Sequence, residues 1–267
     1  MCIRDRFFLF IIIIAGVAAS EVEGIASMVN VPNGSLLGKK RDVTKGVKVE
    51  IGTEEASVDL YVIIEYGTPI QTACQNVQEG VRKAIETIRP IAPDTWILVG
   101  GVRYNAVTSV PTLDMPCDDK IVYNFHCYEP LIFTHQAAPW IARMPHDFHI
   151  AYPLPVGVYA KTAEEVGLWQ AGEAKPGDDE LIGPEYFEKM FMPAIRTAEE
   201  RNVPLYCGEY GVIDLAPAPD TLRWLKDINA AFAKYGIGRA LWTYKVHSFG
   251  LVDAHYDDIR EEMIKVL

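Results

Sequence analysis

Four side chains in the C-terminal two-thirds of the sequence have types that, placed together, could cleave a glycosidic bond. Glu209 follows a short apolar segment, and His126 and Tyr128 follow an earlier one. Trp242 follows a third apolar segment. A carboxylate can act as a nucleophile, hydrogen-bond donors can hold it ionised, and an indole offers a flat apolar face that suits the C–H face of a sugar ring.

Retaining glycoside hydrolysis requires two carboxyl groups about 5–5.5 Å apart, one as nucleophile and one as general acid and base. We expect Glu209 to be the nucleophile, held ionised by hydrogen bonds from Tyr128 and His126, and Trp242 to be the sugar platform. The competing interpretations are a surface carboxylate for Glu209, a buried polar pair for Tyr128 and His126, and a plain core residue for Trp242.

Several further polar residues lie near these segments in the sequence. His135 and His149 fall in a long predicted loop, so both are candidates for substrate contact. His247 and Asp253 follow the last apolar segment and are similar candidates. We expect Glu129 to be a loop residue that points elsewhere.

The elements that would position these residues alternate between strands and helices from about residue 87 onwards. Strands are predicted at 96–99, 121–125, 203–207 and 239–244, and helices at 185–201, 221–235 and 257–267. Such alternation is typical of parallel βα units. In a parallel α/β barrel the active site lies at the carboxyl ends of the strands, which is where the four candidate side chains are expected.

The first 86 residues have a different pattern, typical of a small α+β domain. Helices are predicted at 11–28 and 69–88, strands at 47–51 and 57–65, and a polar loop at 30–44. We therefore predict two domains, 1–86 and 87–267.

The second of these domains resembles glycoside hydrolase family 5, the cellulase and mannanase family. Four motifs carry the resemblance: WILVGG (96–101), VYNFHCYEPLIFTHQAAPW (122–140), PLYCGEYGV (204–212) and ALWTYK (240–245). The resemblance implies an α/β fold that is a partial (β/α) barrel, containing strands five to eight of eight. It also implies Glu209 as nucleophile, His126 and Tyr128 as its neighbours, Trp242 as the sugar platform, and an oligosaccharide or polysaccharide as substrate without a cofactor.

The general acid of that family has no counterpart here. The family carries it in an Asn-Glu-Pro stretch at the end of the fourth strand, and the sequence contains no such stretch. The nearest segment, EYGTP at 65–69, places Gly67 and Thr68 where Asn and Glu are wanted. Glu65 is expected to be an ordinary strand-end residue, with a displaced catalytic acid as the alternative. Because general acid catalysis typically contributes about 10²–10⁴-fold, we expect weak turnover or none.

The first domain resembles the bacterial alkaline-shock-protein family of small cytoplasmic domains tied to envelope stress and scaffolding. The segments that carry this resemblance are IIIIAGVAASEVEGIASM, KGVKVEIG, VDLYVIIEYGTPI and NVQEGVRKAIE. The simplest account of two unrelated resemblances in one chain is that two genes have been joined in frame, either by natural fusion or in sequence assembly. The alkaline-shock resemblance also interprets the apolar N-terminus as a truncated first helix, which implies a cytoplasmic protein. A signal peptide over about residues 7–20 is the alternative, and it would imply secretion.

Composition excludes some functions. The net charge of −11 disfavours binding to phosphate backbones, so nucleic acid is not an expected partner. The five cysteines form no CxxC pair, and neither a metal site nor a disulfide framework is predicted. The N-terminal apolar run is too short for a comfortable transmembrane helix. Three functions remain: a glycosidase acting on β-linked glucan or mannan, a sugar-binding pseudoenzyme, and a non-catalytic envelope-stress or scaffold protein.

Overall fold

A computed structural model of the protein describes residues 22, 25–28, 47–51, 55–60, 62–168, 175 and 177–267. The chain divides into two compact units. Unit 1 comprises Met1–Gly100 and Leu113–Val122, and unit 2 comprises Gly101–Thr112 and Tyr123–Leu267. None of the helices within the described ranges is long and apolar enough to cross a membrane.

Unit 1 combines short strands with one long helix. Its strands are β1 (Ile25–Met28), β2 (Val47–Ile51), β3 (Glu55–Leu60), β4 (Val62–Ile64) and β5 (Trp96–Gly100), and its helix is α2 (Ile70–Ile88). β1 pairs with β4 and β2 pairs with β3, both antiparallel, whereas β3 and β5 are parallel. A small α+β arrangement is therefore present in this part of the chain, as the sequence predicts.

Two predictions about unit 1 are wrong in detail. Ile25–Met28 was expected to be the end of a helix, but it forms a strand that pairs with Val62–Ile64. That partner lies far away in the sequence, so local periodicity cannot reveal the pairing. The single strand expected at 57–65 is two strands with different partners. Residues 11–21 of the expected helix lie outside the described residues.

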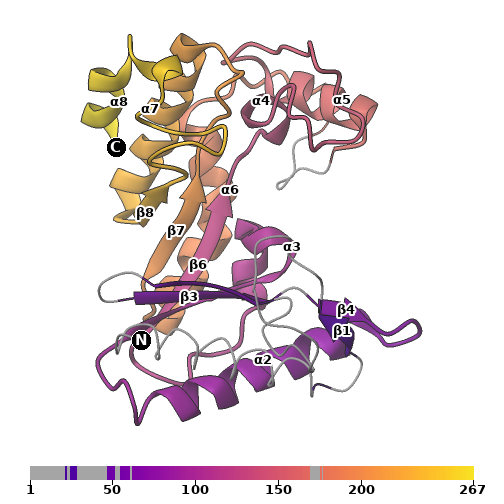
Figure 1. Cartoon of the computed structure of the whole chain (residues 1–267), viewed down its shortest axis with the longest axis vertical. Helices are drawn as coiled ribbons and strands as arrows, with labels where there is room; N and C mark the ends of the chain where they lie inside the picture. The colour runs from indigo at the N-terminus through magenta and orange to yellow at the C-terminus, as the bar shows by residue number, and fades with distance from the viewer. Residues whose placement is uncertain are drawn as a thin grey trace. The chain divides into compact units, whose positions relative to one another are not determined.

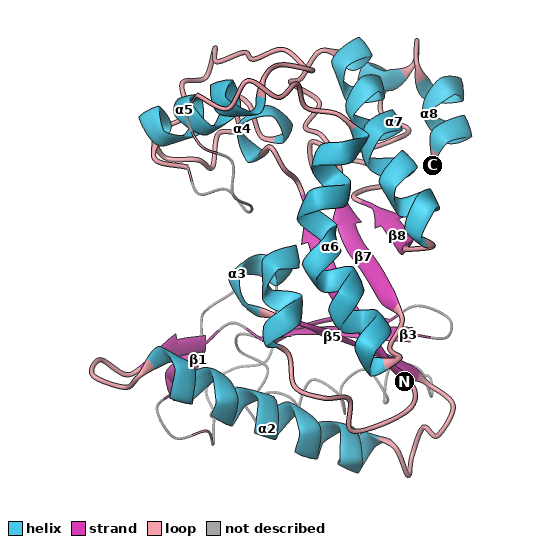
Figure 2. Ribbon diagram, turned by 180° about the vertical axis from the view of Figure 1, so that it is seen from behind, coloured by secondary structure: helices cyan, strands magenta, loops and turns pink. Residues whose placement is uncertain are grey.

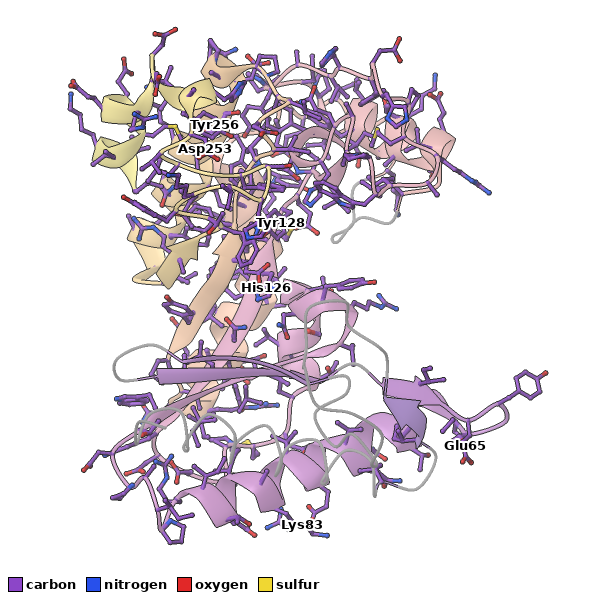
Figure 3. The ribbon with its side chains drawn as sticks, in the orientation of Figure 1. Glu65, Lys83, His126, Tyr128, Asp253 and Tyr256 are labelled. Carbon is purple, nitrogen blue, oxygen red and sulfur yellow. The ribbon has the colours of Figure 1, made fainter. Side chains whose placement is uncertain are left out.

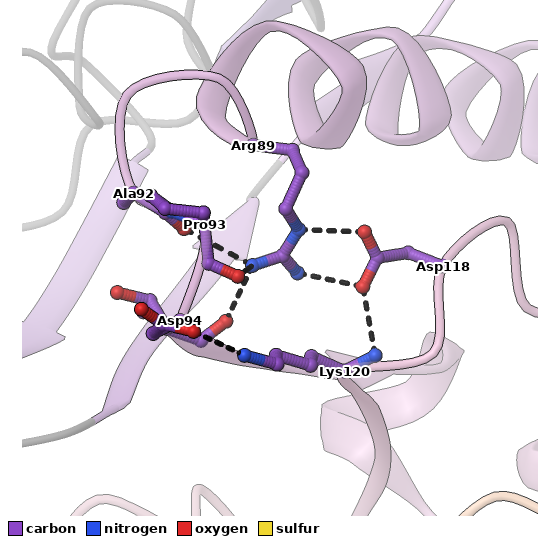
Figure 4. A network of polar contacts seen from close by, with 7 residues as sticks. Arg89, Ala92, Pro93, Asp94, Asp118 and Lys120 are labelled. Atoms are coloured by element: carbon purple, nitrogen blue, oxygen red, sulfur yellow. Dashed lines mark hydrogen bonds and ion pairs between the residues drawn. The ribbon is translucent and has the colours of Figure 1, made fainter.

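A polar network fixes the C-terminal end of α2 (Figure 4). The guanidinium of Arg89 donates to both carboxylate oxygens of Asp118, at 2.6 and 2.7 Å. The backbone N–H of Lys120 also donates to Asp118, and its ammonium donates to Asp94. Three carbonyls accept further bonds from the same guanidinium, those of Ala92, Pro93 and Thr95. Burial acts to raise the pKa of Asp118, but the bonds from Arg89 and Lys120 outweigh it and lower that pKa.

Unit 2 contains a parallel sheet with helices packed on it. The strands β6 (Ile121–Cys127), β7 (Leu205–Tyr210) and β8 (Gly238–Leu241) follow one another in that order, and Tyr123–Cys127 of β6 belong to this unit. Figure 1 shows these strands pointing in the same direction. The longer helices are α5 (Val156–Val166), α6 (Pro184–Arg201), α7 (Ala218–Tyr235) and α8 (Arg260–Val266). Figure 2 shows α6 and α7 across one face of the strands.

Aromatic rings in contact join the strands of unit 2 to its two long helices. Phe191 of α6 lies with its ring centroid 5.2 Å from that of Phe125 and 5.3 Å from that of Phe232. Tyr210 of β7 meets Phe232 edge to face at 5.2 Å. All four side chains are fully buried. Aromatic pairs of this kind contribute about 0.5–1.5 kcal/mol each beyond the burial of their surface.

The helices of unit 2 include some that the sequence analysis did not predict. The predicted helices at 185–201, 221–235 and 257–267 correspond to α6, α7 and α8. The long loop expected after 125 contains α4 (Leu131–Thr134) and α5. Before β6 lie α3 (Val102–Asn105) and the 3-10 helix η1 (Val107–Thr112). Parallel strands that alternate with helices make this unit an α/β fold and part of a (β/α) barrel, as predicted.

Candidate active site

Glu209 is the last residue but one of β7, so the strand extends further than the predicted end at residue 207. Its direction depends on an irregularity in the pairing of β6 with β7. Phe125 is opposite Cys207 and His126 is opposite Glu209, which leaves Gly208 as an extra residue on β7. A bulge of this kind redirects the side chains that follow it. The bulge therefore places Glu209 beside His126.

The carboxylate of Glu209 is in contact with both predicted neighbours. The phenol of Tyr128 donates to Oε2 at 3.1 Å, and Nδ1 of His126 lies 3.4 Å from the same oxygen. The side chains of His126 and Glu209 remain 14% and 21% exposed, so a ligand can reach them. Figure 3 shows His126 on β6 and Tyr128 just beyond the end of that strand. The structure thus brings together three of the four candidate residues.

Tyr128 is held in a setting that keeps its phenol protonated. Burial, and after it the negative charge of Glu209, raises the pKa of Tyr128 well above its usual value. The ring is packed edge-on against His135 at 5.0 Å and against Phe249 at 6.0 Å. A protonated phenol in a fixed position is a hydrogen-bond donor to the carboxylate, and such charge-assisted bonds are stronger than neutral ones.

His135 supports Tyr128 as a packing partner. Burial lowers the pKa of His135 to about 4, so its imidazole is neutral at pH 7. Thr134 Oγ1 donates to the carbonyl of Tyr128 at 2.5 Å and lies 3.0 Å from Nδ1 of His135. Since that hydroxyl has one hydrogen, which it gives to the carbonyl, Nδ1 of His135 must carry a proton and donate. The contact of His135 with substrate stays a prediction.

Trp242 directly follows β8, which ends at Leu241 and not at residue 244 as predicted. The backbone N–H of Trp242 donates to the carbonyl of Tyr210 at 2.9 Å, and this bond attaches the residue to the strand that carries Glu209. Gly211 is required there, because a Cβ at that position would lie 2.3 Å from the carbonyl oxygen of Trp242. The indole is partly exposed, as a sugar-binding platform must be.

The remaining candidates have identifiable surroundings. His247 is exposed and its ring lies 6.3 Å from that of Trp242, whereas Asp253 accepts a bond from the N–H of Val246 at 2.8 Å. His149 contacts Gln136 at 3.4 Å. A role in substrate contact stays a prediction for all three.

Two other carboxylates in the sequence analysis lie in different settings. Glu129 is 6% exposed, and its Oε2 accepts the N–H of Tyr128 at 3.1 Å. Its carbonyl accepts the indole N–H of Trp224 at 2.9 Å, so it is a buried structural residue. Glu65 is exposed in the turn after β4 of unit 1 (Figure 3).

Two amide side chains beside His126 were not anticipated from the sequence. Nδ2 of Asn105 lies 3.4 Å, and Nδ2 of Asn124 lies 3.5 Å, from Nε2 of His126. Asn124 fits because Gly208 has no side chain, since a Cβ there would lie 2.5 Å from its Oδ1. The one available signal was the position of Asn124, two residues before His126 on the same strand face.

Asn105 reaches His126 from an unusual backbone segment. Arg103, Tyr104 and Asn105 have φ values of 58°, 57° and 57°, so three successive non-glycine residues are left-handed. This conformation costs roughly 1–2 kcal/mol per residue for most side chains, although Asn tolerates it better. Such segments often occur at functional sites, where the surrounding structure maintains them.

No group of three or more His, Cys, Asp and Glu side chains suited to a metal ion occurs within the described ranges.

Comparison with known protein families finds two family models that match the chain. Residues 57–248 match the model of the cellulase family, glycosyl hydrolase family 5. The chain belongs to glycosyl hydrolase family 5. Residues 10–95 match a second model, that of the alkaline-shock-protein family with a cell envelope-related function. The two matches share residues 57–95, and the boundary predicted between 86 and 87 falls inside this overlap and stays a prediction.

Individual relatives agree with both matches. Cellodextrinase A of Ruminococcus flavefaciens is 43% identical over 155 residues, which are 58% of this chain and 39% of that protein. The uncharacterised protein YloU of Bacillus subtilis is 33% identical over 98 residues, which are 35% of this chain and 82% of that protein. Both family resemblances predicted from the sequence are therefore confirmed.

The solved structure of the cellulose synthase subunit Z from Clostridioides difficile has the same fold. It superposes with a TM-score of 0.56 at 23% identity, and the match covers 73% of this chain and 56% of that one. The chain spans 39% of the length of the cellodextrinase and 56% of the length of this solved structure.

Proposed function

We propose that the family 5 part of this chain derives from a retaining enzyme of β-linked glucans, with Glu209 as its nucleophile and with impaired turnover. The observation that carries the proposal is the pair of contacts on one carboxylate oxygen, from the phenol of Tyr128 and the imidazole of His126. The phenol of Tyr128 donates to Oε2, which stabilises the ionised form, and the contacts with both rings fix the direction of the carboxylate. The name of the cellodextrinase relative supports a glucan as the substrate.

The proposed chemistry needs two steps. In the first, an oxygen of Glu209 bonds to the anomeric carbon as the bond to the leaving oxygen breaks. An unactivated sugar leaves as an alkoxide that has to be protonated, and the sequence lacks the Asn-Glu-Pro stretch that supplies this proton in the family. In the second step, water must be deprotonated to release the sugar from Glu209, and the same missing residue would do this.

Substrates with different leaving groups test this proposal. 2,4-Dinitrophenyl β-cellobioside releases a phenolate that needs no proton, so we expect a burst of about one equivalent followed by slow turnover. Unsubstituted cellotetraose should react slower by about 10²–10⁴-fold relative to an intact family member. The burst should disappear in Glu209→Gln and persist in Glu65→Gln, the matched control.

Each other outcome contradicts part of the proposal. Absence of the burst would contradict the assignment of Glu209 as nucleophile, and rapid cleavage of cellotetraose would contradict the impaired turnover. Loss of cellotetraose cleavage in Glu65→Gln would identify Glu65 as a displaced acid. Cellotetraose binding without any burst, lost in Trp242→Ala, would favour a sugar-binding pseudoenzyme.

A second candidate function, as a non-catalytic cell-envelope protein, rests on the match of residues 10–95 to the alkaline-shock-protein family. The hypothesis of two joined genes decides whether this function belongs to the same protein. If the two genes were joined only in sequence assembly, amplification across the junction from source DNA would give no product. One continuous product with this sequence would contradict joining in assembly.

A further inference from the structure

The left-handed segment Arg103–Asn105 has one evident consequence in the site. Tyr104 is 85% exposed, so the segment does not serve to bury that ring. Ala106, the next residue, forms a parallel bridge with His126. Gly101, just before the segment, lies so close to Ser109 that a Cβ would be 2.1 Å from its hydroxyl oxygen. The segment is thus fixed at both ends, and it directs Asn105 at the imidazole.

The contacts of His126 define a requirement for its protonation. Nδ1 lies against Oε2 of Glu209, which accepts hydrogen bonds. Nε2 lies against the amide nitrogens of Asn105 and Asn124, which only donate. A ring nitrogen that accepts a bond must be unprotonated, so the hydrogen of a neutral imidazole must be on Nδ1. If the two amides were turned so that their oxygens faced Nε2, those oxygens would accept a hydrogen bond and the proton would be favoured on Nε2.

We propose that Asn105 is a positioning residue that sets the tautomer of His126, so that Nδ1–H donates to Glu209. The consequence for catalysis rests on the proposed function of Glu209, but the tautomer itself does not. Of the two amides, that of Asn105 is positioned independently of His126, since Asn105 comes from a separate segment, whereas Asn124 is on the same strand as His126. A fixed tautomer keeps the imidazole a donor to the carboxylate without a change of its net charge.

Nitrogen NMR of the histidine rings tests the proposal directly. Long-range ¹H–¹⁵N spectra distinguish a protonated ring nitrogen from an unprotonated one, and the chain has only six histidines to assign. The signals of His126 are identified by their loss in His126→Gln. For the full chain at pH 7, we expect a protonated Nδ1 and an unprotonated Nε2.

Two variants at position 105 complete the test. Asn105→Asp presents only acceptor oxygens to Nε2, so we expect Nε2 of His126 to become protonated. Nδ1 then either loses its proton or keeps it in a doubly protonated imidazole. Asn105→Gly keeps a backbone that tolerates positive φ and removes the amide, so we expect the preference for Nδ1 to weaken. Asn202→Asp is the matched control, because Asn202 is also left-handed, at the end of α6, and should leave His126 unchanged.

A protonated Nε2 in the unmodified protein, or an unchanged His126 spectrum in both Asn105→Asp and Asn105→Gly, would overturn the proposal. These results are separate from those on Glu209. If dinitrophenolate is not released but the tautomer responds as expected, the proposed function fails and the positioning role stands. If dinitrophenolate is released and the tautomer does not respond, the reverse holds.

Discussion

His135 should make the fold sensitive to acid, because its pKa in the folded protein is about 4. The usual value in an unfolded chain is about 6.5, so the unfolded state binds the extra proton between these two values. The free energy of unfolding therefore falls as the pH falls through this window. Linkage with these two values gives a loss of about 2.5 kcal/mol between pH 7.5 and pH 4.5. The ring is not completely buried, so this figure is an upper limit.

The variant His135→Phe isolates this contribution. Phenylalanine keeps a ring against Tyr128 and Phe249 but cannot take up a proton. Urea unfolding of both proteins at pH 7.5 and pH 4.5 should show a smaller loss of stability in the variant, by about 1–2.5 kcal/mol. The exposed His146 provides the control, since His146→Gln should follow the unmodified protein. Equal losses in the unmodified protein and His135→Phe, within about 0.5 kcal/mol, would refute the reasoning.

Three further predictions concern other parts of the chain. Asp118→Asn should destabilise unit 1 by about 1.5–3 kcal/mol in urea unfolding, because it removes a charged hydrogen-bond partner. The difference should shrink as the pH falls below about 4, because the unfolded carboxyl then takes up a proton before the native one, whose pKa is lowered. Gly208→Ala should cost about 1–3 kcal/mol, because the added Cβ meets Asn124, whereas Gly183→Ala, with no atom nearer than 3.5 Å, should be tolerated. Trp242→Ala should weaken cellotetraose binding by about 2- to 13-fold in calorimetry, and an unchanged affinity would exclude stacking on the indole.

The sequence was sufficient for what local patterns encode. The apolar segments before His126 and Glu209 are strands, and the helices near 69–88, 185–201 and 221–235 are present at nearly the predicted positions. The contact of Glu209 with Tyr128 and His126 was also predictable, because parallel strands bring their carboxyl ends to one edge. Helix α5 was missed although its signal was present, since Val156, Tyr159, Ala160 and Ala163 are buried at helical spacing.

Other features depend on partners that are distant in the sequence. The bulge at Gly208 is a property of the register between β6 and β7, which no single strand determines. The missing side chain of Gly208 makes room for Asn124. Asn105 was missed because left-handed Arg and Tyr residues have no local sequence signature. The strand β1 was mistaken for helix because its pairing partner is more than thirty residues away.

The covalent state of Glu209 tests the central claim most directly. A 2-deoxy-2-fluoro-β-cellobiosyl fluoride should react with the full chain, because fluoride leaves without a proton and the fluorine at C2 slows release of the sugar. Peptide mass spectrometry should find one added glycosyl group on Glu209, with none in Glu209→Gln. Recovery of unlabelled Glu209, or of the sugar on another carboxylate, would contradict the assignment of Glu209 as the nucleophile.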